Sequence, residues 1–218
     1  MLTLDDYVNF WDWIISLDFN LILDLIGTFA FAISGIRLAS GKNIDLFGAF
    51  VIGLLTAVGG GTIRDLLLGI TPFWLTTPSY VIITSLCLLI VMIFRKYLVS
   101  LNETVFLFDA IGLGFFTVVG MEKAVLMGYP FWVALIMGVV TGSFGGLLRD
   151  ICINEIPLVF RKDIYAMASV VGGLVYGALS LLEINPIVVE SISVLTVISA
   201  RLIAVRYHIS LPILKGYE

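Results

Sequence analysis

The amino-acid sequence predicts an all-α integral membrane protein with seven transmembrane helices, arranged as two inverted three-helix repeats plus a seventh helix. Three observations predict this fold class: an apolar composition, seven apolar runs separated by helix-breaking residues, and an internal repeat at a fixed offset. Of the 218 residues, 60% are hydrophobic and 13% are charged, whereas a soluble protein carries about 25% charged residues. Such a chain cannot cover itself with a polar surface in water, which excludes a separate soluble domain.

The charge and the cysteine content exclude several other classes of protein. The net charge is -4, whereas a nucleic-acid-binding protein needs a basic face. Cys87 and Cys152 lie in apolar runs and fit neither a disulfide framework nor a zinc site. The glycine run at 59–61 lacks the lysine of a nucleotide-binding loop, and the sequence shows no nucleophile paired with a base. We therefore expect no enzyme activity, no cofactor and no metal.

Seven apolar runs fit membrane helices, which need about 20 mostly apolar residues each. They lie at about 21–39, 46–68, 79–95, 105–125, 131–153, 164–182 and 187–205. Proline and glycine between the runs end one helix and begin the next. The expected organisation is an interfacial segment at 1–20, a first repeat at 21–97, a second repeat at 105–182, a seventh helix at 187–206 and a cytoplasmic tail at 207–218.

The basic residues predict the orientation, because short basic loops stay in the cytoplasm. One side of the predicted membrane collects nine of the 12 Lys and Arg residues, namely Arg37, Lys42, Arg95, Lys96, Arg161, Lys162, Arg201, Arg206 and Lys215. The other side has only Lys123, and Arg64 and Arg149 fall inside spans. We therefore expect a multi-pass protein of the cell membrane with its N-terminus outside and its C-terminus in the cytoplasm.

The sequence repeats itself at an offset of 85 residues without a gap. The aligned pairs include Asp24 with Asp109, Gly60-Gly61 with Gly145-Gly146, Arg64-Asp65 with Arg149-Asp150, Pro72 with Pro157 and Tyr80 with Tyr165. Each repeat holds three spans, so the second repeat must enter the membrane from the side opposite to the first. Proteins with such inverted repeats place a transport pathway at the repeat interface, commonly beside broken helices.

Glycines interrupt the second helix of each predicted repeat, at Gly59, Gly60 and Gly61 and again at Gly145 and Gly146. Each costs a helix about 1 kcal/mol relative to alanine, so a kink or unwinding is expected, with a wet cavity or pore beside it. The hydroxyls expected to line that cavity belong to Thr56, Thr62, Thr141 and Ser143. The alternative is close packing, because small residues recur every four positions in both helices.

An Arg-Asp pair lies one turn beyond each glycine cluster, as Arg64-Asp65 and Arg149-Asp150. Ionisable residues within a span usually face the bundle interior or a water-filled path. We therefore expect a charged group near each of two constrictions, close to opposite faces of the membrane. Neighbouring residues point about 100° apart on a helix, so each arginine is expected to pair with a residue other than its adjacent aspartate. The alternative is that both arginines extend to the membrane surface and take no part in permeation.

Four further charged residues have predicted positions. Asp24 and Asp109 lie near the starts of the first and fourth predicted helices. There they would complement the helix dipole or pair with the intramembrane arginines, and both roles remain open. Glu122 and Lys123, at the outer end of the fourth predicted helix, are expected in solvent.

Two three-helix repeats, each with a glycine-broken second helix followed by Arg-Asp, plus a lone seventh helix, resemble the trimeric intracellular cation (TRIC) channel family over about residues 20–206. Prokaryotic members also carry a glycine-transporter domain label. The resemblance implies a homotrimer with one ion pathway through each protomer, bounded by helices kinked at the glycines. It further implies conduction of potassium and, less selectively, sodium, with Arg64 and Arg149 as the basic residues facing the pore.

The chain departs from animal members of that family, which bind a phosphoinositide through basic residues at the glycine motif. Thr56-Ala57-Val58 and Thr141-Gly142-Ser143 occupy those stretches here. Lipid regulation of that kind is therefore not expected.

The first functional hypothesis is a passive monovalent-cation channel, because the repeats are inverted and no coupling carboxylate lies deep in the membrane. The expected partners are potassium and sodium ions, membrane lipid and further copies of the chain in a homotrimer, with no nucleic acid. The alternative is a secondary carrier of a small neutral solute such as glycine, held as a zwitterion by half-helix ends. A purely structural membrane protein is the third possibility.

Overall fold

The computed structural model describes residues 19–94, 104–161, 164–182, 184–210 and 212. Its elements are α2 (Phe19–Ala39), α3 (Leu46–Leu67), α4 (Phe73–Thr76), α5 (Ser79–Ile93), α7 (Thr104–Leu126), α8 (Phe131–Cys152), the 3-10 turn η1 (Leu158–Phe160), α9 (Ala166–Ser180) and α10 (Pro186–Arg206). The predicted interfacial segment at 1–20 lies almost wholly outside the described residues, as does most of the predicted tail at 207–218.

A helix occurs at each of the seven predicted positions, with ends within two residues of the expected ones. Five of these helices, α2, α3, α7, α8 and α10, are long and apolar enough to cross a membrane. The other two, α5 and α9, are apolar but have 15 residues each. At 1.5 Å per residue they measure about 22 Å, less than the hydrocarbon thickness of about 30 Å. That these two helices also cross the membrane stays a prediction.

Local sequence signals explain where several helices begin and end. The carboxylate of Asp45 accepts a hydrogen bond from the amide of Gly48 at 2.7 Å and caps the start of α3. Asn185 caps α10 in the same way, and Pro186 occupies the first helical position. Gly69 and Gly128 follow the ends of α3 and α7 with φ of 73° and 80°, a conformation that suits glycine.

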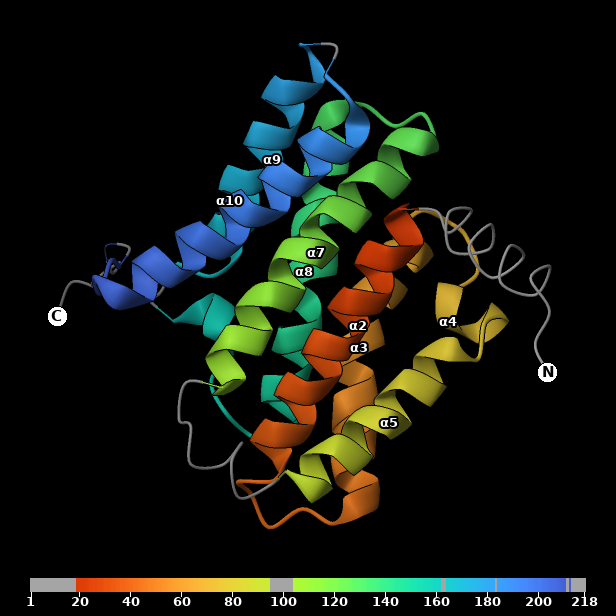
Figure 1. Cartoon of the computed structure of the whole chain (residues 1–218), viewed down its shortest axis with the longest axis vertical. Coiled ribbons are helices and arrows are strands. Elements are labelled where there is room, and N and C mark those ends of the chain that lie inside the picture. Colours follow the sequence, from red (N-terminus) through yellow and green to blue (C-terminus); the bar gives the residue numbers. More distant parts are fainter. Residues whose placement is uncertain (1–18, 95–103, 162–163, 183, 211, 213–218) are drawn as a thin grey trace, which may run out of the picture.

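Four helices, α2, α3, α7 and α8, pack together at the centre of the molecule (Figure 1). Helix α5 lies on one side of this bundle against α2 and α3, while α9 and α10 lie on the other side against α7 and α8. The first predicted repeat therefore occupies one part of the molecule and the second repeat another. The two parts meet along α2 with α7 and α3 with α8.

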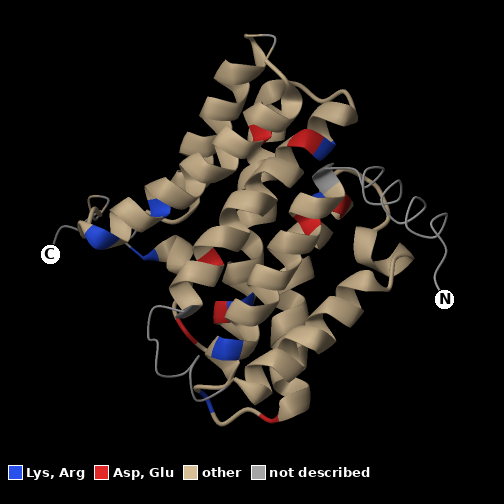
Figure 2. Cartoon of the chain, in the orientation of Figure 1, with Lys and Arg blue, Asp and Glu red and all other residues tan. Residues whose placement is uncertain are grey.

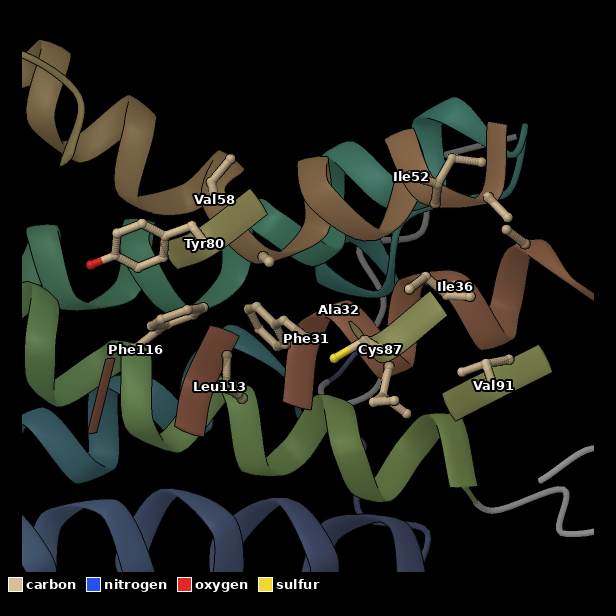
Figure 3. Packing of buried hydrophobic residues seen from close by; sticks show 14 of the residues in the cluster. Phe31, Ala32, Ile36, Ile52, Val58, Tyr80, Cys87, Val91, Leu113 and Phe116 are labelled. Carbon is tan, nitrogen blue, oxygen red and sulfur yellow. The ribbon is translucent and has the colours of Figure 1, made fainter. Parts of the chain in front are cut away.

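The main apolar core lies between α2, α3 and α7 and extends to α5 (Figure 3). The rings of Phe31 and Phe116 meet edge to face, with centroids 5.2 Å apart. Both side chains are buried, and they are 85 residues apart in sequence. Cys87 is buried in the same core as a free thiol. The observed core agrees with the interpretation of this cysteine as a small apolar side chain.

Helices α3 and α8 run without a break through both glycine clusters. Of the kink or unwinding expected there, unwinding is not observed, and a kink within the continuous helices stays a prediction. A Cβ atom added at Gly60 would overlap the carbonyl oxygen of Thr141, and one added at Gly145 would overlap that of Thr56. The backbones of α3 and α8 therefore touch where they cross, so close packing accounts for these glycines in this structure.

Candidate functional site

The two Arg-Asp motifs lie at opposite ends of the α3–α8 pair. Since Thr56 contacts Gly145 and Gly60 contacts Thr141, the two helices are antiparallel and cross near residues 58 and 143. Each arginine lies six residues beyond this crossing, so a rise of 1.5 Å per residue separates them by about 18 Å along the helices. Charged positions are otherwise sparse, and most of the ribbon carries neither sign (Figure 2).

Both arginines are buried within the protein. Arg64 is 3% exposed and Arg149 is 1% exposed. The alternative that these side chains extend to the membrane surface therefore does not describe this structure. Each guanidinium instead belongs to a polar cluster inside the bundle, here named the Arg64 cluster (Asp24, Arg64, Asp65, Phe73, Tyr80 and Lys123) and the Arg149 cluster (Ser34, Asp109, Arg149, Asp150, Leu158, Tyr165 and Arg201).

Each arginine binds its adjacent aspartate, contrary to the sequence-based prediction. The Nε of Arg64 donates to Oδ1 of Asp65 at 2.8 Å, and that of Arg149 donates to Oδ1 of Asp150 at 2.9 Å. The prediction failed because it considered only the directions in which adjacent side chains leave the helix. The arginine side chain is long enough to fold back over the helix end and reach its neighbour.

The second carboxylate oxygen of each motif holds the chain that follows. Oδ2 of Asp65 accepts from the amide of Phe73 at 2.9 Å, at the start of α4. Oδ2 of Asp150 accepts from the amide of Leu158 at 3.0 Å, at the start of η1. The Arg-Asp motif therefore makes the same bonds in both halves of the chain, and it fixes the short turn beyond each helix.

Arg149 has two further partners. Its Nη1 forms an ion pair with Asp109 at 2.5 Å and donates to Oγ of Ser34 at 2.9 Å. Of the two roles left open for Asp109, the structure therefore shows pairing with arginine. Arg201 of α10 lies over the ring of Tyr165, with its guanidinium carbon 5.0 Å from the ring centroid.

The Arg64 cluster pairs the corresponding residues differently. Asp24 accepts a hydrogen bond from the hydroxyl of Tyr80, and within the described part of the chain no ion pair joins Asp24 to Arg64. Lys123 lies 3.0 Å from Oδ1 of Asp65 and is 30% exposed. The prediction that Lys123 is simply solvated was therefore wrong. Asp24 also lies beyond the first turn of α2, where the helix dipole has largely faded.

A separate cavity opens beside each cluster. The cavity of about 480 Å³ at the Arg149 cluster is lined by Asp109, Arg149 and Arg201, among others. The cavity of about 230 Å³ at the Arg64 cluster is lined by Asp24, Arg64, Tyr80, Glu122 and Lys123, among others. Along α2, Phe31 lies between Asp24 and Ser34, and along α7, Phe116 lies between Asp109 and Lys123. Both rings are buried, and they face each other (Figure 3).

The four predicted hydroxyls bond to their own helices. Each donates to the carbonyl oxygen four residues earlier, in the order Thr56 to Ile52, Thr62 to Val58, Thr141 to Met137 and Ser143 to Val139. The hydroxyl of Thr62 also accepts from the indole of Trp74 at 3.0 Å. These bonds are local and satisfied, so a role in lining a pathway stays a prediction.

Ser34 and Arg201 were not among the candidate site residues predicted from the sequence. Ser34 aligns with Val119 at the repeat offset, and Arg201 lies outside both repeats, so neither gave a repeat signal. Tyr80 and Tyr165 did align at the repeat offset, and each of them lies in one of the two clusters. Among the described residues, no group of three or more His, Cys, Asp or Glu is placed to hold a metal ion.

Comparisons with known proteins place the chain among membrane proteins and channels. A family model described as "Glycine transporter" matches residues 21–96 and 106–180. A "UPF0126 membrane protein" of Vibrio cholerae is 38% identical over 193 residues, which are 88% of this chain and 81% of that protein. Two solved structures show a similar fold.

The first is a TRIC trimeric intracellular cation channel orthologue from Rhodobacter sphaeroides, with a TM-score of 0.82 and 33% identity, covering 87% of this chain and 98% of that one. The second, solved to explain conductance through TRIC cation channels, has a TM-score of 0.81 and 36% identity, covering 90% of this chain and 98% of that one. These relatives are membrane proteins and channels, which confirms that the chain is not an enzyme. Together with the apolar helices, they show a multi-pass membrane protein.

Proposed function

The chain belongs to the glycine transporter family and shares the fold of solved TRIC cation channels, and from this premise we propose that it is a potassium-permeable channel. The pore runs through each protomer of a homotrimer. Potassium ions and, less selectively, sodium ions pass through it, and membrane lipid surrounds the trimer.

One observation carries the proposal. Two buried Arg-Asp clusters lie about 18 Å apart along antiparallel helices, and each opens into its own cavity. Ionisable groups inside a membrane are costly and usually mark an ion or substrate path. Both signs of charge are present in each cluster, so the ends of the pathway are polar without a strong net charge.

The proposed pore is closed in this arrangement by Phe31 and Phe116, two buried rings in edge-to-face contact that lie between the Arg64 cluster and the Arg149 cluster along α2 and α7. We propose that α3 and α8 bend at Gly59–Gly61 and at Gly145 and Gly146 when the pathway opens. Glycine lowers the stability of a helix interior, and both glycine clusters lie at the crossing of these two helices. Bending there would move the Arg-Asp motifs of α3 and α8 relative to the aromatic pair on α2 and α7.

The proposed architecture has seven spans, with two inverted repeats at 21–97 and 105–182 and a seventh helix at 187–206. Two findings support the repeats. The family model matches two separate segments of the chain, and buried contacts recur at the offset of 85, such as Gly27 with Phe116 and Gly112 with Phe31. The excess of basic residues on one side supports an external N-terminus and a cytoplasmic C-terminus.

The proposal is tested by potassium efflux from proteoliposomes that contain the purified protein. We expect efflux that is driven by the potassium gradient. The rate of efflux should not saturate with potassium concentration, as the rate of a carrier would. Asp24→Asn removes a cavity-lining charge and should slow the efflux. Asp45→Asn is the matched control, because Asp45 is an exposed helix cap and asparagine caps equally well.

Two results would overturn the proposal. Saturable uptake of glycine without potassium flux would assign the protein to the carrier class. No flux of either solute would favour a structural role.

A further inference from the structure

The same three residue types are paired in two different ways at the two ends of the molecule. Asp24, Arg64 and Tyr80 correspond to Asp109, Arg149 and Tyr165 at the offset of 85. In the Arg64 cluster, tyrosine donates to the aspartate. In the Arg149 cluster, arginine holds the aspartate instead.

The Arg149 cluster contains three buried polar atoms without a hydrogen-bond partner. These atoms are the hydroxyl oxygen of Tyr165, Oδ2 of Asp109 and Nε of Arg201. Buried polar groups are nearly always paired, so several unpaired atoms in one cluster require an explanation. The pairing seen at Tyr80 and Asp24 would satisfy the tyrosine and the aspartate.

The tyrosine is within reach of the aspartate. A Cβ atom added at Gly146 would lie 2.5 Å from the hydroxyl oxygen of Tyr165 and 3.5 Å from Oδ1 of Asp109. The hydroxyl and the carboxylate are therefore no more than about 6 Å apart, which is the most that two such distances from one point allow. A swing of the side chain about its Cα–Cβ bond would close that gap.

Two differences between the repeats explain which pairing each cluster adopts. The first is at Ser34, which binds Arg149 at 2.9 Å. Its counterpart is Val119, which lines the cavity at Arg64 and has no hydroxyl to offer. Ser34 therefore gives the arginine of only one cluster a second anchor on α2.

The second difference is at Phe73, whose counterpart is Leu158. The ring of Phe73 occupies the space in front of Gly61 and packs edge to face against Tyr80, with centroids 4.5 Å apart. In the other cluster the hydroxyl of Tyr165 lies in front of the equivalent glycine, Gly146. The phenylalanine ring thus directs one tyrosine to its aspartate, and leucine leaves the other tyrosine free to lie elsewhere.

We propose that Arg149 and Tyr165 compete for Asp109, with Ser34 and Leu158 as positioning residues that hold the cluster in its arginine-bound arrangement. Phe73 holds the other cluster in the tyrosine-bound arrangement. The consequence of this competition for conduction rests on the proposed function. Asp24 is hydrogen-bonded to a neutral hydroxyl, whereas Asp109 is ion-paired with Arg149. The two ends of the pathway therefore differ, and the open channel rectifies.

The test combines structure determination with recording in symmetric potassium chloride. Ser34→Ala removes one hydrogen bond to a charged group, which shifts the ratio of the two arrangements by roughly tenfold. The structure of this variant should show the hydroxyl of Tyr165 bonded to Asp109. Its rectification ratio should move toward one. Ser34→Ala combined with Tyr165→Phe should recover the wild-type ratio, because the competing hydroxyl is gone.

A structure of Ser34→Ala with Arg149 still on Asp109, together with an unchanged rectification ratio, would overturn the inference while leaving the channel proposal intact. Absence of current in the wild-type protein would instead count against the channel proposal. The pairing in the Ser34→Ala structure would still test the competition. A variant that does not fold gives no current, whereas recovery of the wild-type ratio in the double variant requires the competition itself.

Discussion

Arg149 illustrates how a buried charge is held at the scale of single residues. Its guanidinium is bound by two carboxylates and one hydroxyl in a site with almost no solvent exposure. Removal of one partner from such a group is costly, because it leaves uncompensated charge in a medium of low dielectric constant. The position of Arg149 in the bundle interior could be predicted from its place in a span. The role of Ser34, which holds Arg149 from another helix, could not.

Arg149→Met should therefore lower the free energy of unfolding by about 3–5 kcal/mol, because Asp109 and Asp150 lose a shared cation. Thermal unfolding of the detergent-solubilised protein measures this change. Arg161→Met is the matched control, since Arg161 is 41% exposed in its pair with Glu155 and surface pairs contribute about 0–1 kcal/mol. Equal losses in the two variants would contradict the assignment of a buried network.

A second prediction concerns pH. A hydrogen bond and an ion pair from Lys42, at 2.6 Å, hold the pKa of Glu155 below its ordinary value. A lowered folded-state pKa stabilises the protein above the ordinary pKa, and this stabilisation is lost as the pH falls through the lowered value. The midpoint of thermal unfolding should therefore differ between wild type and Lys42→Met at neutral pH. The two midpoints should converge in acid, and 1 M salt should reduce the neutral difference. A difference independent of pH would contradict the pair.

At the scale of elements, the crossing of α3 and α8 organises the site. Both helices were predicted from their apolar length, with ends that agree within two residues. The one-turn elements α4 and η1 were not predicted. They begin where Asp65 and Asp150 accept a backbone amide, so they depend on contacts between segments that hydrophobic periodicity does not report. At the glycine clusters, helix breakage was given more weight than the close packing that is observed, and a kink there stays a prediction.

Gly60→Ala should lower the free energy of unfolding by about 1–3 kcal/mol, the usual effect of overpacking. The added methyl group would overlap the carbonyl of Thr141 and force α3 and α8 apart. Gly41→Ala is the control, because Gly41 is exposed and its nearest neighbouring atom would lie 3.5 Å away. The control should stay within about 0.5 kcal/mol of wild type. Equal thermal midpoints for both variants would show that the crossing tolerates separation.

At the scale of the whole molecule, composition and positive-inside bias predict a multi-pass protein with a defined orientation. Reporter fusions test the orientation and the number of spans together. Green fluorescent protein fused after residue 97 and after residue 206 should fluoresce, because both points are expected in the cytoplasm. Alkaline phosphatase fused after residue 128 should be active, because that point is expected outside. An external residue 97 would show that α5 does not cross the membrane.

The likeness to TRIC channels was recognised from the doubled glycine and Arg-Asp motifs, and the fold comparison agrees with it. The pairing of charges inside each cluster could not be predicted from the sequence, because it depends on which residues of α2, α7 and α10 contact the ends of α3 and α8. Ser34 carries a hydroxyl group where the aligned Val119 carries two methyl groups. Only the packed bundle shows that this difference falls beside an arginine.

Single-channel recording across a potassium chloride gradient tests the central claim most directly. The purified protein in a planar bilayer should give unitary currents whose reversal potential follows the potassium equilibrium potential. A reversal potential at the chloride equilibrium potential, or the absence of unitary currents from correctly folded protein, would contradict a cation channel.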